Sequence, residues 1–302
     1  MSAQLFLLNG MLRIAVKPAA RYLAVRADKV HQYRPMVCRA AGLLAMPDHI
    51  HIEPLDADSF QGEWLHSLRA VKVDERVVLY IPGGAFSIGS PITHRGITAR
   101  LAHFTGCRVL AVNYSKAPEH PYPAALHDVL NAYQWLLDQG VPSNNVVIAG
   151  DSSGGNLTLA TLQALRDANS PLPAAGICLS PWADLAGNGV SMRFNRRHDA
   201  MVPYRHIKDA ARKYAGQIPL DDARVSPLYG NFSGLPPLLI HAGDKELLFS
   251  DATRLASRAR RAGVNVDMKI WRNAPHAFQL FAGLVPQSNH SLRQISSWIQ
   301  QL

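Results

Sequence analysis

The feature that most constrains this chain is a serine between two glycines, where an apolar segment meets a helix-like one. Residues 146–156 read VVIAGDSSGGN, which is typical of a buried strand, then Gly-x-Ser-x-Gly, then the start of a helix. This pattern sets Ser152 on a sharp turn, because side chains at the flanking glycine positions would clash with the strand and the helix. The helix start also supplies backbone N–H groups and a positive dipole end. The pattern predicts Ser152 as a nucleophile; the alternative is a Gly/Ser-rich turn that only caps the helix.

A second glycine-rich turn follows another apolar segment. Residues 77–81 read VVLYI and lead into PGGAF, which begins at Pro82. Glycines after a strand let backbone N–H groups approach an incoming oxygen closely. A Pro-Gly pair also suits an ordinary type II turn. Because the serine turn lies downstream, we expect the N–H groups of Gly83, Gly84 and Ser153 to form an oxyanion hole.

Apolar strand-like segments alternate with helix-like segments along most of the 302 residues. The sequence predicts strands over 76–81, 107–112, 146–149, 175–179, 237–241 and 266–271, and helices over 124–138, 154–167, 250–261 and 288–301. Such alternation is typical of an α/β fold with a mostly parallel sheet covered by helices on both faces. A predicted hairpin, with strands over 49–53 and 60–65, adds an antiparallel edge.

Two segments depart from this alternation and are interpreted as a cap. Residues 182–220 are polar, basic and aromatic, and follow a predicted strand, so we expect a helical insertion over the carboxyl edge of the sheet. Near the N-terminus, apolar residues recur at helical spacing and predict an amphipathic arm, which Pro18 divides or whose second helix it opens. We expect a single domain over 1–302, with cap elements at about 1–45 and 182–220. The apolar positions of the arm are Leu8, Leu12, Ala15, Val16, Ala19 and Leu23.

The charge of the chain is concentrated near its N-terminus. The formal net charge is +9, and residues 1–40 hold seven basic residues and one acid, Asp28, so 7 − 1 = +6 of the excess lies there. Such an arm could contact nucleic acid or an anionic membrane surface. No nucleic-acid motif accompanies the charge. We therefore interpret the basic residues as a solvated helix face and expect no nucleic-acid partner.

The cysteines and the absence of long apolar runs bear on the cellular setting. Three cysteines, Cys38, Cys107 and Cys178, are odd in number and far apart, so they predict neither a disulfide framework nor a close-spaced zinc site. No run of 18 apolar residues is present. The apolar stretch at 5–8 has no basic stretch before it, unlike a typical signal peptide. We expect a cytoplasmic protein.

Several ordered motifs resemble the hormone-sensitive-lipase-like branch of the α/β-hydrolase fold, which is named for its Gly-Asp-x-Gly turn. The resemblance implies an α/β-hydrolase fold and a carboxylesterase activity that needs no metal and no cofactor. The chain departs from the branch at three positions: Pro82 stands in place of a histidine, Ala85 in place of a third glycine, and Ser153 in place of an alanine. Proline removes one N–H donor from the turn. The matching segments are 80–86, 113–124, 150–155, 180–185, 226–229 and 234–237.

The resemblance implies the chain order serine, acid, histidine. Among 13 histidines, His276 lies in the turn after the last predicted strand and matches the branch's His-x-Phe turn. We expect it to be the base that activates the serine. The other histidines downstream of the serine lie in the insertion, inside a predicted strand or at the start of the last predicted helix: His198, His206, His241 and His290.

Three acidic residues follow the strand predicted over 237–241, namely Asp244, Glu246 and Asp251. An acid at this place can equally be a first-turn residue favoured by the helix dipole. Aligned on the branch's Asp-Pro-Leu-x-Asp segment, Glu246 takes the acid position, 276 − 246 = 30 residues before His276. We expect Glu246 to be the acid, and Asp244 and Asp251 stay open.

Together these features predict a serine carboxylesterase that hydrolyses short- to medium-chain acyl esters through a Ser-His-Glu triad and an acyl-enzyme intermediate. Its expected partner is a small-molecule ester, and a homodimer is compatible with the sequence. A lactone or an amide or formamide would suit the same residues. A membrane-surface lipase that uses the basic arm and a non-catalytic ligand-binding relative are less favoured alternatives.

Overall fold

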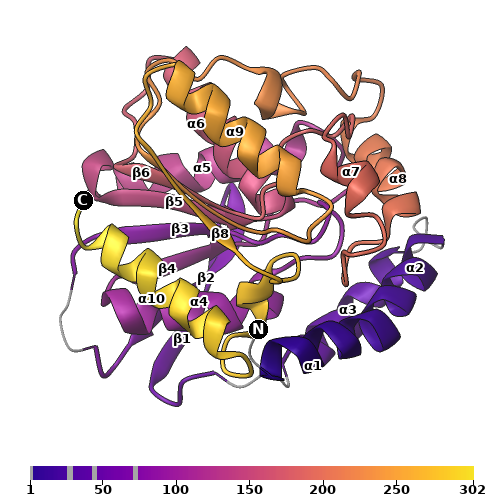
Figure 1. Cartoon of the computed structure of the whole chain (residues 1–302). Coiled ribbons are helices and arrows are strands. Elements are labelled where there is room, and N and C mark those ends of the chain that lie inside the picture. Colours follow the sequence, from indigo (N-terminus) through magenta and orange to yellow (C-terminus); the bar gives the residue numbers. More distant parts are fainter. Residues whose placement is uncertain (1–2, 26–29, 43–45, 71–73) are drawn as a thin grey trace.

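The computed structural model describes residues 3–25, 30–42, 46–70 and 74–302. An eight-stranded sheet, in the order β1-β2-β4-β3-β5-β6-β7-β8, forms its centre (Figure 1). β1 and β2 form an antiparallel hairpin, β2 pairs antiparallel with β4, and every other pairing is parallel. The α/β fold and its antiparallel edge are therefore as predicted. The strands are β1 (Ile50–Ala57), β2 (Phe60–Ser67), β3 (Val77–Ile81), β4 (Arg108–Val112), β5 (Val146–Asp151), β6 (Ala175–Leu179), β7 (Leu238–Gly243) and β8 (Val266–Trp271).

Helices cover both faces of the sheet (Figure 1). On one face, α4 (Pro91–Thr105) and α10 (Pro286–Ile299) bury residues such as Ile97 and Leu292 against the strands. On the other face lie α5 (Ala124–Asp138), α6 (Ser153–Asp167) and α9 (Phe249–Arg261). The continuous apolar strands are buried on both sides, as parallel strands between two helical layers must be.

The predicted strands and helices of the parallel part are confirmed, with ends that differ by at most two residues. The sequence analysis missed α4. This helix buries residues on nearly all of its sides, so its sequence shows no single apolar stripe. Its ends carry the missed signals: Ser90 and Thr93 form a capping box with Pro91 at the first position, and Gly106 ends the helix at a φ of 78°.

The N-terminal arm is helical, as predicted, and its inner face is buried. It consists of α1 (Ala3–Met11), a π-helical turn η1 (Leu12–Val16), α2 (Lys17–Val25) and α3 (Val30–Ala41), and Pro18 lies in the first turn of α2. Leu5, Leu8 and Leu12 pack against Ala200 of the insertion and Val285. Of the apolar positions that predicted the amphipathic arm, Ala15 and Ala19 do not belong to the buried face, because both are exposed. The side chain of Leu23 lies outside the described residues.

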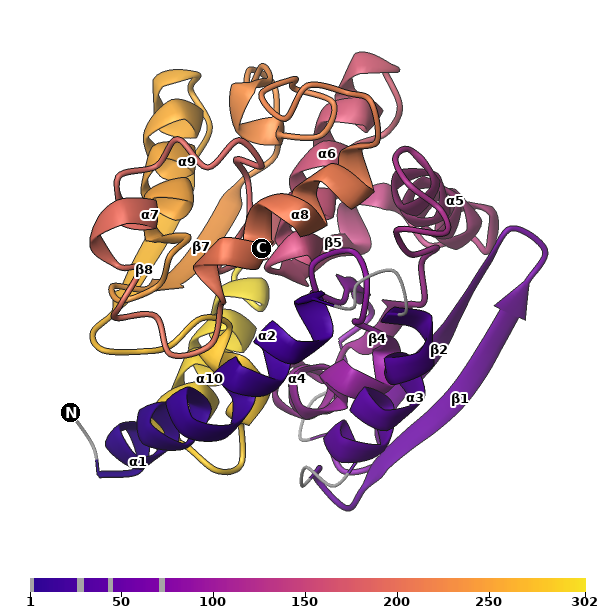
Figure 2. The ribbon, with the colours of Figure 1, turned by 90° about the vertical axis from the view of Figure 1, so that its right-hand side faces the viewer.

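The insertion contains α7 (Ser191–Phe194) and α8 (Tyr204–Ala215), and α8 lies beside α2 of the arm (Figure 2). The basic side chains of the arm reach this insertion and the neighbouring loops. Lys17 Nζ donates to the carbonyl oxygen of Asp199 at 2.5 Å, and Arg13 donates to that of His198 at 3.1 Å. Arg34 pairs with Glu119 at 2.7 Å. For Lys17 and Arg34 the interpretation as a solvated face is wrong, since they are buried or half-buried and attach the arm to the body. Arg13 stays exposed while it makes its contact.

Among the described residues, no helix combines the length and the apolar character that crossing a bilayer requires.

The turn at Ser152 generates a stability prediction. A Cβ at Gly154 would overlap the backbone oxygen of Ile81, which cannot move without disturbing β3. We expect Gly154→Ala to lower the free energy of unfolding by about 3 kcal/mol. Gly10→Ala is the matched control, because a Cβ at this helical position meets nothing within 4 Å and should stabilise by about 0.5–1 kcal/mol. Urea unfolding measures both; equal stability of the two variants would contradict the packing argument.

Candidate active site

Ser152 sits at the carboxyl end of β5, between the strand and α6, in a strained backbone conformation. Its φ is 53° and its ψ is −117°, a region that residues with a Cβ rarely occupy. Two hydrogen bonds hold the turn: Ser152 N–H donates to Leu179 O at 2.9 Å, and Trp182 N–H donates to Ser152 O at 3.0 Å. The half-buried side chain of Ser152 therefore projects from a fixed backbone.

The turns that follow β7 and β8 bring the predicted histidine and one of the three acids to this serine. His276 Nε2 lies 2.9 Å from Ser152 Oγ, and His276 Nδ1 lies 3.0 Å from Glu246 Oε2. The imidazole is 3% exposed and the carboxylate is fully buried. Side chains 124 and 30 residues apart in the sequence thus form one continuous hydrogen-bonded row.

The second oxygen of Glu246 fixes the orientation of its carboxylate. Oε1 accepts a hydrogen bond from Ser180 Oγ at 2.7 Å and another from the backbone N–H of Gly243. Ser180 Oγ in turn accepts from the N–H of Ala277, directly after His276. The serine side chain therefore links the acid turn to the histidine turn.

The other two acids left open by the sequence lie elsewhere. Asp244 accepts from the N–H of Asn273 at 2.7 Å, so it braces the turn that carries the histidine. Asp251 accepts from the N–H of Asp184 at 2.9 Å. Burial, together with repulsion from Asp184, raises the pKa of Asp251 well above its ordinary value. Of the three acids, Glu246 pairs with His276.

The remaining downstream histidines are not brought to Ser152. His241 hydrogen-bonds to Ser291 at 2.8 Å, and burial lowers the pKa of this imidazole to about 3. His198 contacts the carbonyl oxygen of Phe194, and His290 stacks edge-on against the ring of Trp271. The side chain of His206 lies outside the described residues.

One residue of the expected oxyanion hole has its donor occupied. Gly83 N–H points at Asp151 Oδ1, 3.0 Å away, with His94 Nε2 at 3.1 Å. The expectation for Gly83 is therefore wrong, because an N–H already donating to the buried carboxylate of Asp151 is not available to a substrate oxygen. Within the described part of the chain, no acceptor is found for the N–H groups of Gly84, Ala85 and Ser153.

The hydrogen bond from Gly83 N–H to Asp151 has a structural role that was not predicted from the sequence. Asp151 is fully buried and accepts from Tyr80 Oη at 2.8 Å, while His94 lies at 3.1 Å. Burial alone would raise the pKa of Asp151, but His94, Tyr80 and the N–H of Gly83 outweigh it and lower the pKa. A charged Asp151 thus ties the glycine turn to the serine turn. The Asp that precedes the serine and the Thr-His pair near the start of α4 were its only sequence signals.

Side chains of the insertion hold the acid turn from outside. Asn195 Nδ2 donates to the carbonyl oxygens of Asp244 and Glu246 at 3.0 and 2.8 Å. Asp199 Oδ2 accepts from the N–H of Leu247 at 2.8 Å. No sequence pattern pointed to these two residues, because their partners are backbone atoms about 50 residues away.

The charge around His276 favours its protonated form. Burial lowers the pKa of the imidazole, but the hydrogen bond and charge of Glu246, with the charges of Asp199 and Asp151, outweigh it and raise the pKa above its ordinary value. An imidazole in this setting accepts a proton readily and holds it beside a buried carboxylate. The arrangement suits a base that takes a proton from a hydroxyl.

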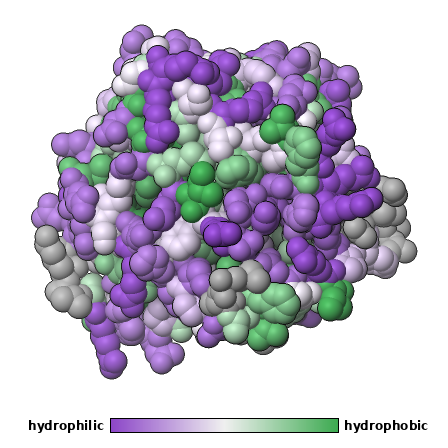
Figure 3. All heavy atoms as spheres, viewed as in Figure 1, coloured by the Kyte–Doolittle hydropathy of each residue, from purple (hydrophilic) through white to green (hydrophobic). Residues whose placement is uncertain are grey.

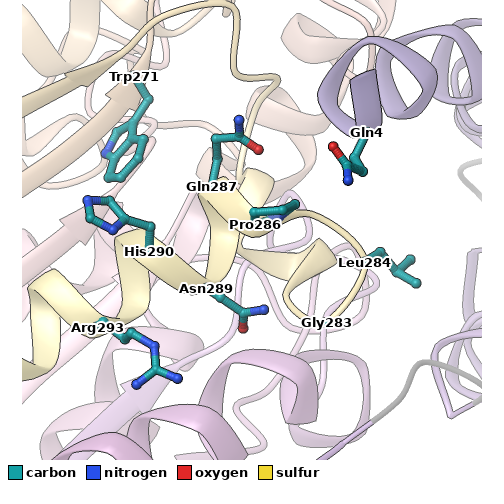
Figure 4. Close-up of a pocket in the computed structure, with 9 residues that line it drawn as sticks. All are labelled: Gln4, Trp271, Gly283, Leu284, Pro286, Gln287, Asn289, His290 and Arg293. Atoms are coloured by element: carbon teal, nitrogen blue, oxygen red, sulfur yellow. The ribbon is translucent and has the colours of Figure 1, made fainter. Parts of the chain in front are cut away.

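A surface hollow of about 650 Å³ lies apart from these residues, between the start of α1 and the start of α10 (Figure 4). Gln4 lies on its α1 side, and Leu284, Gln287 and His290 line the other side. None of Ser152, His276 and Glu246 lines it.

The fold and the geometry can be set beside known proteins. A family model described as the alpha/beta hydrolase fold matches residues 78–280. This match covers more than half of the chain and includes both glycine-rich turns, β5 and the turn with His276. The chain belongs to the α/β-hydrolase fold family.

Similar proteins place it within that family. An acetyl-hydrolase of Streptomyces hygroscopicus is 37% identical over 239 residues, 79% of each chain. An esterase of Acinetobacter venetianus is 34% identical over 270 residues, 89% of this chain and 88% of its own. The crystal structure of an esterase from the bacterial hormone-sensitive lipase family matches with a TM-score of 0.90 and 36% identity, and covers 100% of this chain and 98% of its own. The protein is a serine ester hydrolase of the hormone-sensitive-lipase-like branch.

The balance of effects on His276 can be tested by titration. Glu246→Gln removes the main interaction that raises the pKa of His276. Burial then dominates, so this pKa should fall below the ordinary value of about 6.5. In the control Asp251→Asn it should stay raised, because Asp251 contacts Asp184 and not the imidazole. Histidine-resolved NMR titration of the three proteins measures the pKa. An unchanged value in Glu246→Gln would mean that another acid supports the imidazole.

Proposed function

We propose that the protein is a carboxylesterase that hydrolyses short- to medium-chain acyl esters through an acyl-enzyme intermediate, with Ser152, His276 and Glu246 as its catalytic triad. The observation that carries this proposal is the hydrogen-bonded row from Ser152 Oγ through His276 to Glu246. Serine oxygen is a weak nucleophile without an adjacent base, and the row supplies one. The esterase and acetyl-hydrolase names of the similar proteins support the same reaction class.

In the first half of the reaction, Ser152 Oγ attacks the ester carbonyl carbon and its proton passes to His276 Nε2. The carbonyl oxygen becomes an oxyanion that accepts hydrogen bonds from the N–H groups of Gly84, Ala85 and Ser153. Preorganised backbone donors of this kind stabilise developing charge at no cost in reorganisation. The imidazolium is stabilised by Glu246, and it protonates the departing alcohol, which leaves the acyl group on the serine.

In the second half, water takes the position of the alcohol. His276 removes a proton from the water as its oxygen attacks the acyl carbon, and then returns a proton to Ser152 Oγ as the acid is released. Glu246 stays ionised and holds Nδ1 protonated, so that Nε2 faces the serine in both halves. The same donors hold the second oxyanion.

We propose that the cap elements at about 1–45 and 182–220 bound the acyl side of the site and limit chain length. Phe86, directly after the donors of the glycine turn, stacks flat on Tyr214 of α8 with ring centroids 3.6 Å apart. Trp182 lies 5.7 Å from Phe86. These buried aromatic rings fix the insertion against the oxyanion turn. The acetyl-hydrolase among the similar proteins acts on a short acyl group by its name, which agrees with a confined pocket.

Substitution of the serine and the acid tests the proposed triad. Ser152→Ala should abolish the burst of alcohol that accompanies acyl-enzyme formation on p-nitrophenyl butyrate and leave only residual turnover. Glu246→Gln should lower kcat by about 10³–10⁴-fold, because the imidazole loses its orientation and its countercharge. Asp251→Asn should keep the wild-type kcat. Stopped-flow and steady-state assays measure these values. Wild-type turnover by Ser152→Ala would contradict the proposed triad.

The dependence on pH tests the proposed base. His276 must be neutral to accept the serine proton, so a raised pKa moves the acidic limb of kcat/KM to a pH above about 6.5. Asp199→Asn removes one of the charges that raise the pKa of His276, and the limb should move to lower pH. A pH–rate profile measures the midpoint, and circular dichroism checks that Asp199→Asn folds. Coincident midpoints would show that Asp199 acts only as a structural support.

A further inference from the structure

The N-terminal arm is apolar both on its inner face, which packs against the body, and on its outer face, which is exposed. On α1 and η1, large apolar side chains point away from the body, and no element among the described residues covers them. Figure 3 shows the hydrophobic surface gathered over α1. Single exposed apolar residues are ordinary, but four within nine positions of one helix form a patch. The members are Phe6, Leu7, Met11 and Ile14, which are 63%, 68%, 49% and 81% exposed.

The patch extends beyond α1. Leu284, on the loop before α10, is 52% exposed and lines the same hollow as Gln4 of α1 (Figure 4). At the other end, Tyr22 of α2 is 55% exposed. We call Phe6, Leu7, Met11 and Ile14 the outer apolar face. Its helix is held to the body by the buried Leu5, Leu8 and Leu12, so the face is presented by a fixed support.

The charge beside this face has one sign. Residues 1–27 contain no acidic residue and four basic ones, Arg13, Lys17, Arg21 and Arg26. Lys17 is buried against Asp199, whereas Arg13 is exposed. The contact from Arg13 to the backbone of His198 brings the arginine-rich segment of the insertion next to the arm. That segment adds three exposed arginines, Arg193, Arg196 and Arg197.

We propose that the outer apolar face docks on an anionic lipid surface, with the helix of α1 and η1 lying flat in the headgroup region. A surface helix with apolar side chains on one side and cations flanking it, without carboxylates, has the composition of an interfacial anchor. Its apolar side chains enter the acyl boundary, and the cations are attracted by the negative surface potential. Both contributions are needed, because four side chains alone bury little apolar area.

Charge favours this occupant over a second copy of the chain. A two-fold contact through the arm would bring the same surface of both copies together. The exposed Arg13 of each arm and the neighbouring Arg193, Arg196 and Arg197 would then bring like charges into one contact, with no acid in residues 1–27 to compensate them. An anionic lipid surface supplies the opposite charge over the whole length of the helix.

The arm also contacts the catalytic side of the molecule. Asn9 Nδ2, on α1 between the two faces, donates to the carbonyl oxygen of Asn273 at 3.0 Å, three residues before His276. Docking through the outer apolar face therefore holds the edge of the sheet that carries Ser152 near the lipid. Lipid binding itself does not depend on hydrolysis, so its test is separate from that of the proposed function.

Vesicle co-sedimentation tests the proposal with the full-length protein. We expect binding to vesicles of about seven parts phosphatidylcholine to three parts phosphatidylglycerol, with little binding to phosphatidylcholine alone. Binding should weaken strongly in about 1 M NaCl, where the Debye length is about 3 Å. The double variant Leu7→Ser with Ile14→Ser should bind at least ~10-fold more weakly, since it loses two inserted side chains.

The matched control is Leu68→Ser with Ile270→Ser, which replaces two exposed apolar residues at 69% and 49% exposure on the sheet strands and their turns. It should bind like the wild type. Circular dichroism and urea unfolding should give wild-type signals for both double variants, which shows that they fold. Equal binding to neutral and anionic vesicles, or undiminished binding by the arm variant, would overturn the proposal. So would a solution dimer that only the arm variant loses, which would make the face a contact between copies.

Discussion

The backbone of Ser152 is the constraint on which the rest of the site depends. A φ of 53° at a residue with a Cβ is unfavourable, and the surroundings enforce it. β5 and α6 approach so closely that a glycine is required at 150, and α6 lies so close to the end of β3 that another is required at 154. Hydrogen bonds from neighbouring turns fix the peptide groups on both sides. The strain places one hydroxyl at the carboxyl edge of the sheet and leaves the N–H of Ser153 beside it. The other turns are positioned relative to that point.

Two buried carboxylates, Asp151 and Glu246, hold the other turns of the site in place around Ser152. Asp151 joins the glycine turn to the serine turn through Gly83, and Glu246 joins the acid turn to His276. Each is surrounded by donors, as a buried charge must be. This explains why Pro82 is tolerated in a position where the branch has a histidine. The turn is held through the next residue, Gly83, by Asp151 and His94, so the missing N–H of the proline is not needed.

The sequence was sufficient for the sheet, the serine and the histidine, because these depend on local patterns: alternation, glycines around Ser152 and a turn after the last strand. The sequence was insufficient where residues far away in the chain determine whether an N–H group is free or which side of a helix is buried. The sequence does not show that the N–H of Gly83 donates to Asp151, which is 68 residues away. Ala15 and Ala19 fit an inner stripe at regular α-helical spacing, but the π-helical turn at Leu12–Val16 changes the spacing and leaves them exposed. The assignment of Glu246 rested on the resemblance, since spacing alone left Asp244 and Asp251 open.

The arm shows how one segment can serve folding and surface recognition with different sides. Its inner leucines and its contacts through Lys17 and Asn9 attach it to the insertion and to the turn that carries His276. Those contacts bury one side of the helix and use the charge of Lys17. Stability would be served equally by a polar outer side, because exposed apolar side chains gain nothing from folding. Packing within the monomer does not call for Phe6, Leu7, Met11 and Ile14, and the proposed lipid surface accounts both for their exposure and for the lack of acids in residues 1–27.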